Sequence, residues 1–387
     1  MFESQVKMIA GLRENYSDKF VFPQPETPQE LVEAVTAQIG APFDSSILVL
    51  FTVEWALYLR EIGYTNICVS TKGDATVQKL CQALGFVYQD ISEIEKNNMK
   101  FDVVVGNPPY QQGKNNNFYQ DFVKIAFTVS TDIVAMVTPS NWTSFADKDS
   151  KFLSLLKKNG LNYYKFLGSN AFKNVQLLTV VFICSKKSNS NVVSINTDTD
   201  TITVPVDDLC YFPTASADLF KTVSKIAALK LPGISAVKGN LDRNKVIPDI
   251  NGIKCIMSVG KRGGDFDIEL VSSLHLERGE IVGIGSHKVV ISRITSIGKL
   301  GEAKYAGPEY ACAQGCYAIY TDSKDSALRL IEYLNSPVVK AIVQELKGSV
   351  CSNSQNIFST IPAVEYADSM IACLTPEEIN LIESMLK

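Results

Sequence analysis

Short apolar runs alternate with helix-like segments through the first half of this chain. The runs are Ile47–Phe51, Asn66–Ser70, Asp102–Val105, Ile133–Val137 and Thr179–Cys184. Helix-like patterns occupy about 28–39, 54–62, 74–84, 118–128 and 149–158. Because parallel strands need long crossovers, this alternation predicts an α/β fold with a doubly wound sheet. Ligands bind such sheets in the crevice beyond the carboxyl ends of the strands.

The pattern changes after the last of these runs. A stretch at 185–202 is rich in Ser, Asn, Thr and Asp, and this composition indicates a loop or a domain boundary. A more irregular, strand-rich region follows, with a helical pair near 325–347 and a last helix near 376–386. Ser336-Pro337 should divide the pair, because proline disfavours helical geometry in its predecessor. We expect two domains, at 1–200 and 201–387, the second a smaller α+β domain.

Bulk composition excludes several classes of protein. A chain of 387 residues with 46% hydrophobic and 20% charged residues is long enough for two globular cores. Its apolar runs are far shorter than the roughly 20 residues that span a bilayer, and its first residues lack the pattern of a secretion signal. Nine scattered cysteines indicate reduced thiols. We therefore expect a cytoplasmic protein that binds no membrane and no metal.

Charge is unevenly distributed along the chain. The net charge is −4, yet residues 220–304 contain 14 Lys and Arg against 8 Asp and Glu. The rest of the chain then carries about −10. A local basic surface is sufficient for phosphate contacts, although many solvated surfaces have a similar surplus.

The motif with the clearest chemistry is Asn107-Pro108-Pro109-Tyr110, directly after the apolar run Phe101–Gly106. The prolines should end the strand, since proline cannot donate a backbone hydrogen bond. An amine on an aromatic ring is a poor nucleophile, and two oxygen acceptors on its N–H groups would hold it and favour a more reactive geometry. Asn107 and the Pro108 carbonyl can be these acceptors. Tyr110 can stack on the ring, a contact worth about 1–3 kcal/mol. The alternative is a simple strand-ending turn.

With this motif the chain resembles the N6-adenine DNA methyltransferases of restriction–modification systems. The resemblance implies a Rossmann-like S-adenosylmethionine (SAM)-dependent methyltransferase domain at 1–200 and direct methyl transfer to N6 of an adenine flipped out of double-stranded DNA. Residues 201–387 would be the DNA target-recognition domain. The stretches that resemble it are Lys288–Arg293, Tyr317–Tyr320, Ala327–Ser336 and Ile361-Pro362. A cognate restriction endonuclease is a partner that the family suggests, while the oligomeric state stays open.

The same resemblance assigns cofactor residues on both sides of the motif. Thr27 and Pro28 resemble the N-terminal element that lines the methionine end of SAM, and they also predict a helix with Thr27 as its N-cap. Asp74 takes the position of the acidic residue that holds the ribose hydroxyls. Asp90 matches the residue that contacts the adenine amine of SAM.

One cofactor motif departs from the family pattern. Residues 47–56 contain no glycine, where the family has a glycine-rich turn that lets the backbone approach the cofactor. Phe51 keeps the aromatic position of that motif. Glu54 could accept from the cofactor's amino group or simply favour the helix N-terminus. Trp55 is expected in the core or in a lid rather than against the cofactor.

A second stacking residue is implied at Phe172, which would cover the face of the base opposite Tyr110. Two further functions stay open beside adenine methylation of DNA. One is a methyltransferase acting on RNA or on a protein glutamine, because the same four motif residues can hold planar amides. The other is a catalytically silent DNA-binding or assembly subunit that has lost SAM binding.

Overall fold

The computed structural model describes residues 27–110, 117–144, 151–168, 178–197, 200–209, 211–213, 216–260, 265–296, 298–348 and 352–384. The chain divides into two compact units. The first comprises Met1–Trp142 and Asp149–Leu209, and the second comprises Thr143–Lys148 and Cys210–Lys387. The predicted boundary after residue 200 falls between two paired strands of the first unit. Within the described ranges, no helix is long and apolar enough to cross a membrane.

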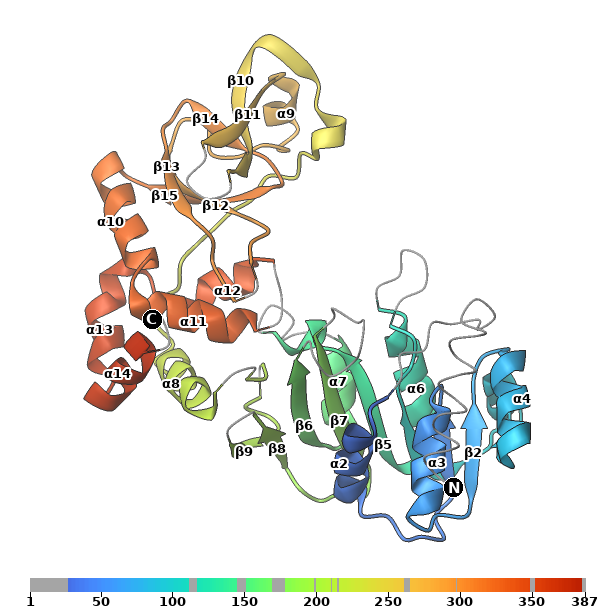
Figure 1. Ribbon diagram of the computed structural model, residues 1–387. Helices are drawn as coiled ribbons and strands as arrows, with labels where there is room; N and C mark the ends of the chain where they lie inside the picture. The colour runs from blue at the N-terminus through green and yellow to red at the C-terminus, as the bar shows by residue number, and fades with distance from the viewer. Residues whose placement is uncertain are drawn as a thin grey trace. The chain divides into compact units, whose positions relative to one another are not determined.

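A nine-stranded sheet forms the centre of the first unit, in the order β3-β2-β1-β4-β5-β7-β6-β8-β9 (Figure 1). Strands β1 to β5 are mutually parallel, and β7 inserts antiparallel between β5 and β6. The strands are β1 (Ile47–Leu50), β2 (Ile67–Ser70), β3 (Val87–Tyr88), β4 (Phe101–Gly106), β5 (Ser130–Pro139), β6 (Leu161–Gly168), β7 (Thr179–Ser185), β8 (Val192–Asn196) and β9 (Thr201–Pro205).

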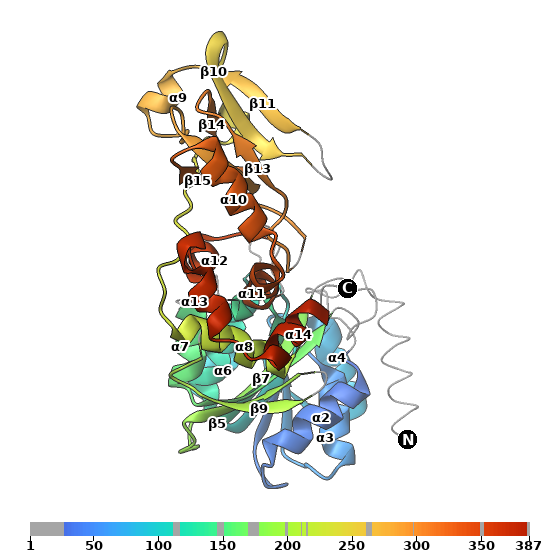
Figure 2. The ribbon, with the colours of Figure 1, turned by 90° about the vertical axis from the view of Figure 1, so that its left-hand side faces the viewer.

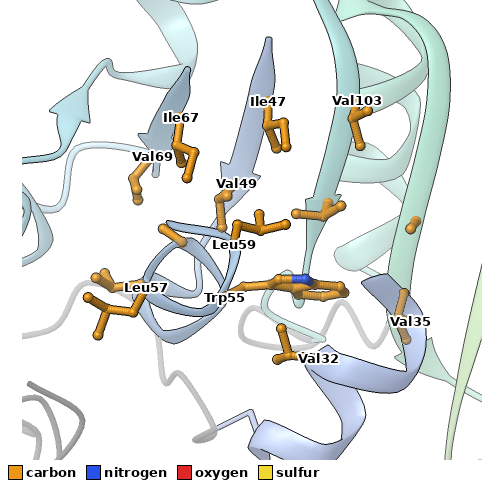
Figure 3. Packing of buried hydrophobic residues seen from close by; sticks show 14 of the residues in the cluster. Val32, Val35, Ile47, Val49, Trp55, Leu57, Leu59, Ile67, Val69 and Val103 are labelled. Carbon is orange, nitrogen blue, oxygen red and sulfur yellow. The ribbon is translucent and has the colours of Figure 1, made fainter. Parts of the chain in front are cut away.

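Helices cover both faces of this sheet. They are α2 (Gln29–Ile39), α3 (Val53–Glu61), α4 (Ala75–Leu84), α5 (Ile91–Lys96), α6 (Tyr119–Val129), the 3-10 turn η2 (Asn141–Thr143) and α7 (Lys151–Lys158). Figure 2 shows α2, α3 and α4 on one side and α6 and α7 on the other. Alternate strand residues such as Ile47, Val49 and Val103 pack with Trp55 against the first group (Figure 3). The predicted doubly wound α/β fold is confirmed.

One sequence interpretation is wrong. The polar stretch 185–202 was expected to be a loop or a domain boundary, but it contains β8 and the first residues of β9. Val193 and Ile195 are fully buried, while the residues between them remain accessible. This period of two is that of a half-buried strand, and the many polar residues around it concealed the signal.

The second unit combines two three-stranded sheets with a group of helices. The sheets have the orders β11-β10-β14 and β13-β12-β15. Their strands are β10 (Pro248–Val259), β11 (Phe266–Val271), β12 (His287–Ser292), β13 (Ala303–Ala306), β14 (Tyr310–Cys312) and β15 (Cys316–Thr321). Ile256 of β10, Val290 of β12 and Ala318 of β15 lie in one buried cluster, so the two sheets share a core.

The helices of the second unit precede and follow these sheets, except for α9, which lies between β11 and β12. They are α8 (Ala217–Ala228), η4 (Arg243–Lys245), α9 (Leu274–Glu277), α10 (Lys324–Leu334), α11 (Pro337–Lys347), α12 (Gln355–Thr360), η5 (Val364–Tyr366), α13 (Ala367–Ala372) and α14 (Pro376–Ser384). Ser336 caps α11 by accepting from the Val339 N–H, and Pro337 occupies the first turn. The predicted division of the helical pair at Ser336-Pro337 is confirmed.

The basic surplus at 220–304 does not form one free surface. Arg243 pairs with Asp267 and Glu269. Lys288 is fully buried, and its Nζ donates to two backbone carbonyls at 2.7 Å. Part of the positive charge is therefore neutralised or buried within the unit, and only the remainder is available to a ligand.

Candidate active site

The carboxyl ends of three neighbouring strands lie in register at one edge of the large sheet. Leu50, the last residue of β1, is paired with Ser70 of β2 and with Gly106 of β4. The chain continues from these points into Phe51, Thr71 and Asn107. The strand order reverses between β1 and β4. The carboxyl ends of these two strands therefore mark the topological switch point, where open α/β sheets bind their ligands.

Gly106 determines how closely β4 approaches β1 just before the motif. A Cβ atom at this position would lie 2.4 Å from the backbone oxygen of Leu50 and 2.8 Å from its Cβ. Any side chain would therefore push the two strands apart and move Asn107, whose N–H donates to the Leu50 carbonyl at 3.3 Å. From the sequence, Gly106 is recognisable only as the end of an apolar run, and this requirement was not predicted.

Asn107 is buried, and the nitrogen of its side-chain amide is hydrogen-bonded to Thr27. Nδ2 donates to Thr27 Oγ1 at 3.4 Å, and both side chains are at most 3% exposed. Among the described residues nothing donates to Oδ1, which is buried as well. An unsatisfied buried oxygen costs about 1–3 kcal/mol, so this atom is an acceptor that an N–H from a ligand can satisfy.

Thr27 does not cap α2 as predicted. The helix begins at Gln29, and the capping position is Pro28, which makes no side-chain cap hydrogen bond. The Thr27 hydroxyl is instead the acceptor for Asn107, and a single Oγ1 directed toward β4 is not available to the first turn of α2. Thr27 and Pro28 nevertheless lie beside the motif, since Thr27 contacts Asn107 directly.

The remaining motif residues lie around Asn107. Pro108 and Pro109 are buried, and Tyr110 is partly buried. Burial raises the pKa of the Tyr110 hydroxyl well above its ordinary value, and the nearby Asn107 amide acts in the opposite direction. No described residue forms a well-aligned hydrogen bond with that hydroxyl. Tyr110 is thus neutral at physiological pH and carries a second unsatisfied polar atom. Phe172, the predicted second stacking residue, lies outside the described residues.

Phe51 forms the turn after β1 without a glycine. It has φ 68°, a left-handed conformation that is unusual for a bulky residue and costs about 1–3 kcal/mol. The ring is fully buried and packs edge-on against Phe122 of α6, with ring centroids 4.6 Å apart. The backbone turn expected from glycine therefore exists here, and aromatic packing holds it.

The next residues lead into α3. Thr52 occupies the N-cap position and Glu54 lies in the first turn, where a carboxylate is favoured by the helix dipole. Glu54 is 7% exposed. Trp55 is fully buried, and its Nε1 donates to Thr36 Oγ1 at 3.4 Å. The assignment of Trp55 to the core is confirmed.

The two predicted aspartates each cap a helix. Asp74 accepts from the Thr76 and Val77 N–H groups at the start of α4. Asp90 accepts from the Ser92 N–H at the start of α5 and from the Gly73 N–H at 2.6 Å. Burial opposes ionisation of Asp90, but hydrogen bonds from Ser92 and Gly73 outweigh it and lower its pKa. Both residues thus organise the loop after β2.

Further buried hydroxyls line this edge and were missed by the sequence analysis. Ser70 Oγ and Thr52 Oγ1 are buried, as is Thr179 Oγ1 at the start of β7, which pairs with Pro139 at the end of β5. None has a hydrogen-bond partner among the described residues. Their common signal is a hydroxyl residue at or next to a strand end on this side of the sheet. Like Asn107, these residues lie at or next to the carboxyl ends of β1, β2 and β4, or beside the end of β5.

Hydroxyl and carboxylate oxygens at such positions can accept N–H and O–H groups from a ligand. The strand order defines a Rossmann-like α/β domain, with the Asn107–Tyr110 motif at its switch point. Its resemblance to adenine-specific methylases is borne out by comparison with known proteins.

Residues 69–172 match the model of the Eco57I restriction-modification methylase family. An uncharacterized adenine-specific methylase of Mycoplasma pneumoniae is 34% identical over 114 residues, covering 24% of this chain and 26% of that protein. Among solved structures, the type IIG restriction endonuclease BpuSI is 12% identical and covers 94% of this chain and 61% of its own, with a TM-score of 0.45. A modification subunit of a putative type I restriction enzyme from Vibrio vulnificus is 16% identical over 49% of each chain, with a TM-score of 0.37.

The matched segment contains the motif and both aspartates, but it is a limited part of the chain. This chain spans about a quarter of the length of the curated relative that it matches. The likeness to restriction–modification methylases therefore rests on residues 69–172, and the fold rests on the strand order described above.

Proposed function

We propose that this chain is a SAM-dependent methyltransferase that modifies N6 of adenine in double-stranded DNA. The observation that carries the proposal is the buried, unsatisfied Oδ1 of Asn107 at the switch point of the sheet. A buried acceptor whose other amide atom is already fixed by Thr27 has one remaining use, which is to accept an N–H from a ligand.

The chain's residues would act on the amine before and during transfer. Asn107 Oδ1 and the Pro108 carbonyl each accept one N–H, which holds N6 in position and favours a pyramidal nitrogen. The neutral Tyr110 ring stacks on the base, which must leave the duplex to enter the site. SAM supplies an electrophilic methyl group on its sulfonium, and the proton that N6 loses passes to solvent.

Cofactor binding is assigned to the residues around the same edge. Ser70 and Thr52 offer unsatisfied hydroxyls. Asp90 Oδ2 already accepts one N–H from Gly73 and has capacity for another, as a residue that binds the adenine amine requires. Thr27 and Pro28, Phe51 through its turn, Glu54 and Asp74 complete the proposed set.

Transfer of labelled methyl from SAM to mixed-sequence DNA tests this proposal, followed by methylation-sensitive sequencing. Wild-type protein should label adenine at a defined site, and Asn107→Ala should abolish the label. Asn159→Ala is the matched control, because Asn159 lies in the same unit and its Nδ2 donates to the Leu155 carbonyl in the last turn of α7. Equal loss of label in both variants would indicate a general folding defect. The effect of Asn107→Ala would then no longer support a catalytic role for Asn107.

Two other functions make different predictions in that experiment. A silent DNA-binding or assembly subunit would give no label and no SAM binding by calorimetry. The absence of glycine from the turn after β1 favours the silent subunit. The left-handed backbone at Phe51 argues against it, because the turn that glycine would provide is still formed. A methyltransferase for RNA or protein glutamine would bind SAM and leave DNA unlabelled. A cognate restriction endonuclease remains a proposed partner.

A further inference from the structure

One buried hydroxyl at the carboxyl edge of the large sheet has no role in the proposed function. Thr179 begins β7, and the whole residue is 0% exposed. Its Oγ1 has no hydrogen-bond partner among the described residues. A buried hydroxyl without a partner destabilises a protein, whereas valine has nearly the same shape and would not. The Thr179 hydroxyl is therefore a candidate for contact with a ligand.

Strand register places Thr179 close to the motif. Asn107 follows the last pair of β4 and β5 and is therefore level with Val137 of β5. Thr179 is paired with Pro139, two residues further along β5. Neighbouring strands lie about 5 Å apart, and each residue advances a strand by about 3.3 Å. Thr179 thus lies two strands, or about 10 Å, to the side of Asn107 and about 7 Å further out.

The side chains of Asn107 and Thr179 lie on the same face of the sheet. Side chains alternate between the two faces along a strand, and Val105 of β4 and Val181 of β7 belong to one buried cluster. Asn107 is two residues beyond Val105 and takes the same face. Thr179 is two residues before Val181 and takes it as well. The hydrogen bond from Asn107 to Thr27 agrees, because α2, which follows Thr27, packs on that cluster.

An apolar surface separates these two polar groups. Strand β5 runs between β4 and β7, and its residues Val137 and Pro139 are both buried on the same face. Sites that bind planar rings are mostly apolar, with a few polar groups that fix the orientation of the ligand. Here an amide oxygen lies at one end, a hydroxyl at the other, and carbon atoms lie between them.

Thr179 is held in position by the end of β5. The carbonyl of Leu178 accepts from the N–H and from the hydroxyl of Ser140, at 2.9 and 3.0 Å. Thr138 Oγ1 accepts from Trp142 Nε1 at 3.1 Å. The hydroxyls of Ser140 and Thr138 are therefore used within the fold, and the hydroxyl of Thr179 is left for a ligand.

The strand order gives the two sides of Asn107 to different ligands. Strands β1 and β2 lie on one side of β4, and β5 and β7 lie on the other. The hydroxyls of Thr52 and Ser70, which are proposed to bind the cofactor, belong to the β1 and β2 side. Direct transfer requires the methyl donor and the acceptor to meet at Asn107 from opposite directions. Thr179 is thus on the side of the acceptor.

We infer that Thr179 belongs to the acceptor pocket and that its hydroxyl donates to a ring nitrogen of the base. This inference rests on the proposed function and names a contact that selects its substrate. Asn107 holds the amine, and Thr179 holds a ring atom, so the base is fixed at two points and cannot turn in its own plane. A base with C–H in place of that nitrogen would leave the hydroxyl unsatisfied and would be rejected.

Bases that lack one ring nitrogen test the inference. Duplexes carry adenine or its 1-deaza, 3-deaza or 7-deaza analogue at the methylated position, and kcat/KM is measured for the full chain. Thr179→Val should lower kcat/KM on adenine about tenfold, as expected for one hydrogen bond. One of the three analogues should cost wild-type protein a similar factor and cost the variant nothing further. The other two should affect both proteins equally.

Two further variants separate this contact from general effects on the fold. Thr179→Ser keeps the hydroxyl and should retain most of the rate. Thr203→Val makes the same change at an exposed position of β9, the last strand of the sheet, and should behave as wild type does. In urea, Thr179→Val should be at least as stable as wild-type protein, because it removes an unsatisfied hydroxyl. A loss of stability would show that the hydroxyl has a partner within the fold and would contradict the inference.

The outcomes distinguish the inference from the function on which it rests. If wild-type protein methylates adenine and each analogue has the same relative effect on both proteins, the Thr179 contact is wrong and the proposed function stands. If Thr179→Val weakens SAM binding in calorimetry by the factor that it costs in rate, Thr179 serves the cofactor, and the inference is again wrong. If wild-type protein labels no adenine in DNA, both are wrong.

Discussion

Thr27 and Asn107 are 80 residues apart in the sequence, yet one hydrogen bond joins their buried side chains, from Asn107 Nδ2 to Thr27 Oγ1 at 3.4 Å. This bond determines which atom of the amide is left for a ligand. With Nδ2 engaged, Oδ1 is the free atom, and an oxygen can accept an N–H from the target amine. Thr27 is therefore a positioning residue for Asn107.

Thr27→Val keeps the shape of the side chain and removes the acceptor. We expect kcat for DNA methylation to fall about tenfold, which corresponds to roughly 1.4 kcal/mol and to the net value of one hydrogen bond. Thr27→Ser should restore most of the rate. Steady-state kinetics provide the test. A raised KM for SAM with unchanged kcat would show instead that Thr27 acts only through the cofactor.

Gly106→Ala should damage both stability and activity. The added Cβ would meet the Leu50 backbone oxygen at 2.4 Å, and backbone cannot move aside as a flexible side chain can. We expect a loss of about 2–4 kcal/mol in the free energy of unfolding, measured by urea denaturation. Gly40→Ala is the comparison, since a Cβ there meets nothing within 4 Å. Only its left-handed φ should cost about 1 kcal/mol. Equal effects in the two variants would contradict the proposed clash.

Phe51 allows backbone strain to be separated from side-chain packing. At an ordinary position alanine is more stable than glycine by about 0.5–1 kcal/mol. At φ 68° this order should reverse, so Phe51→Gly should unfold at higher urea concentration than Phe51→Ala. Both variants lose the ring contact with Phe122, so the free energy of that contact cancels when the two are compared. The usual order of alanine above glycine would mean that the turn relaxes once the ring is removed.

Glu345 should make stability depend on pH. Burial raises its pKa to about 8 from an ordinary value of 4.5, and no described residue donates to either of its oxygens. Between these values the folded state binds more protons than the unfolded state. The contribution of Glu345 to stability is therefore fully present below pH 4.5, and it falls by up to about 1.4 kcal/mol per pH unit as the pH rises toward 8.

Glu345→Gln removes this titration with little change in shape. We expect the variant and wild-type proteins to be similar in stability near pH 5, and the variant to be more stable by roughly 3 kcal/mol at pH 8. Urea unfolding from pH 5 to 8 provides both curves, and their difference isolates Glu345 from other titrating groups. Parallel curves would show that the Glu345 carboxyl reaches water or a partner in the folded state.

Much of the first unit could be predicted from local pattern. Each apolar run expected to be a strand is one, because buried parallel strands are continuous hydrophobic segments of limited length. In the second unit, by contrast, short strands with mixed polar faces give little periodicity, and no boundaries were predicted for β10 to β15.

The sequence by itself determined the alternation of strands and helices, the position of Asn107-Pro108-Pro109-Tyr110 past a strand, and the break at Ser336-Pro337, because each depends on neighbours within a few residues. Only the tertiary structure decided that Thr27 orients Asn107 and that Gly106 sets the distance between β1 and β4. These relationships depend on strand register and side-chain direction across dozens of residues, which no local periodicity contains.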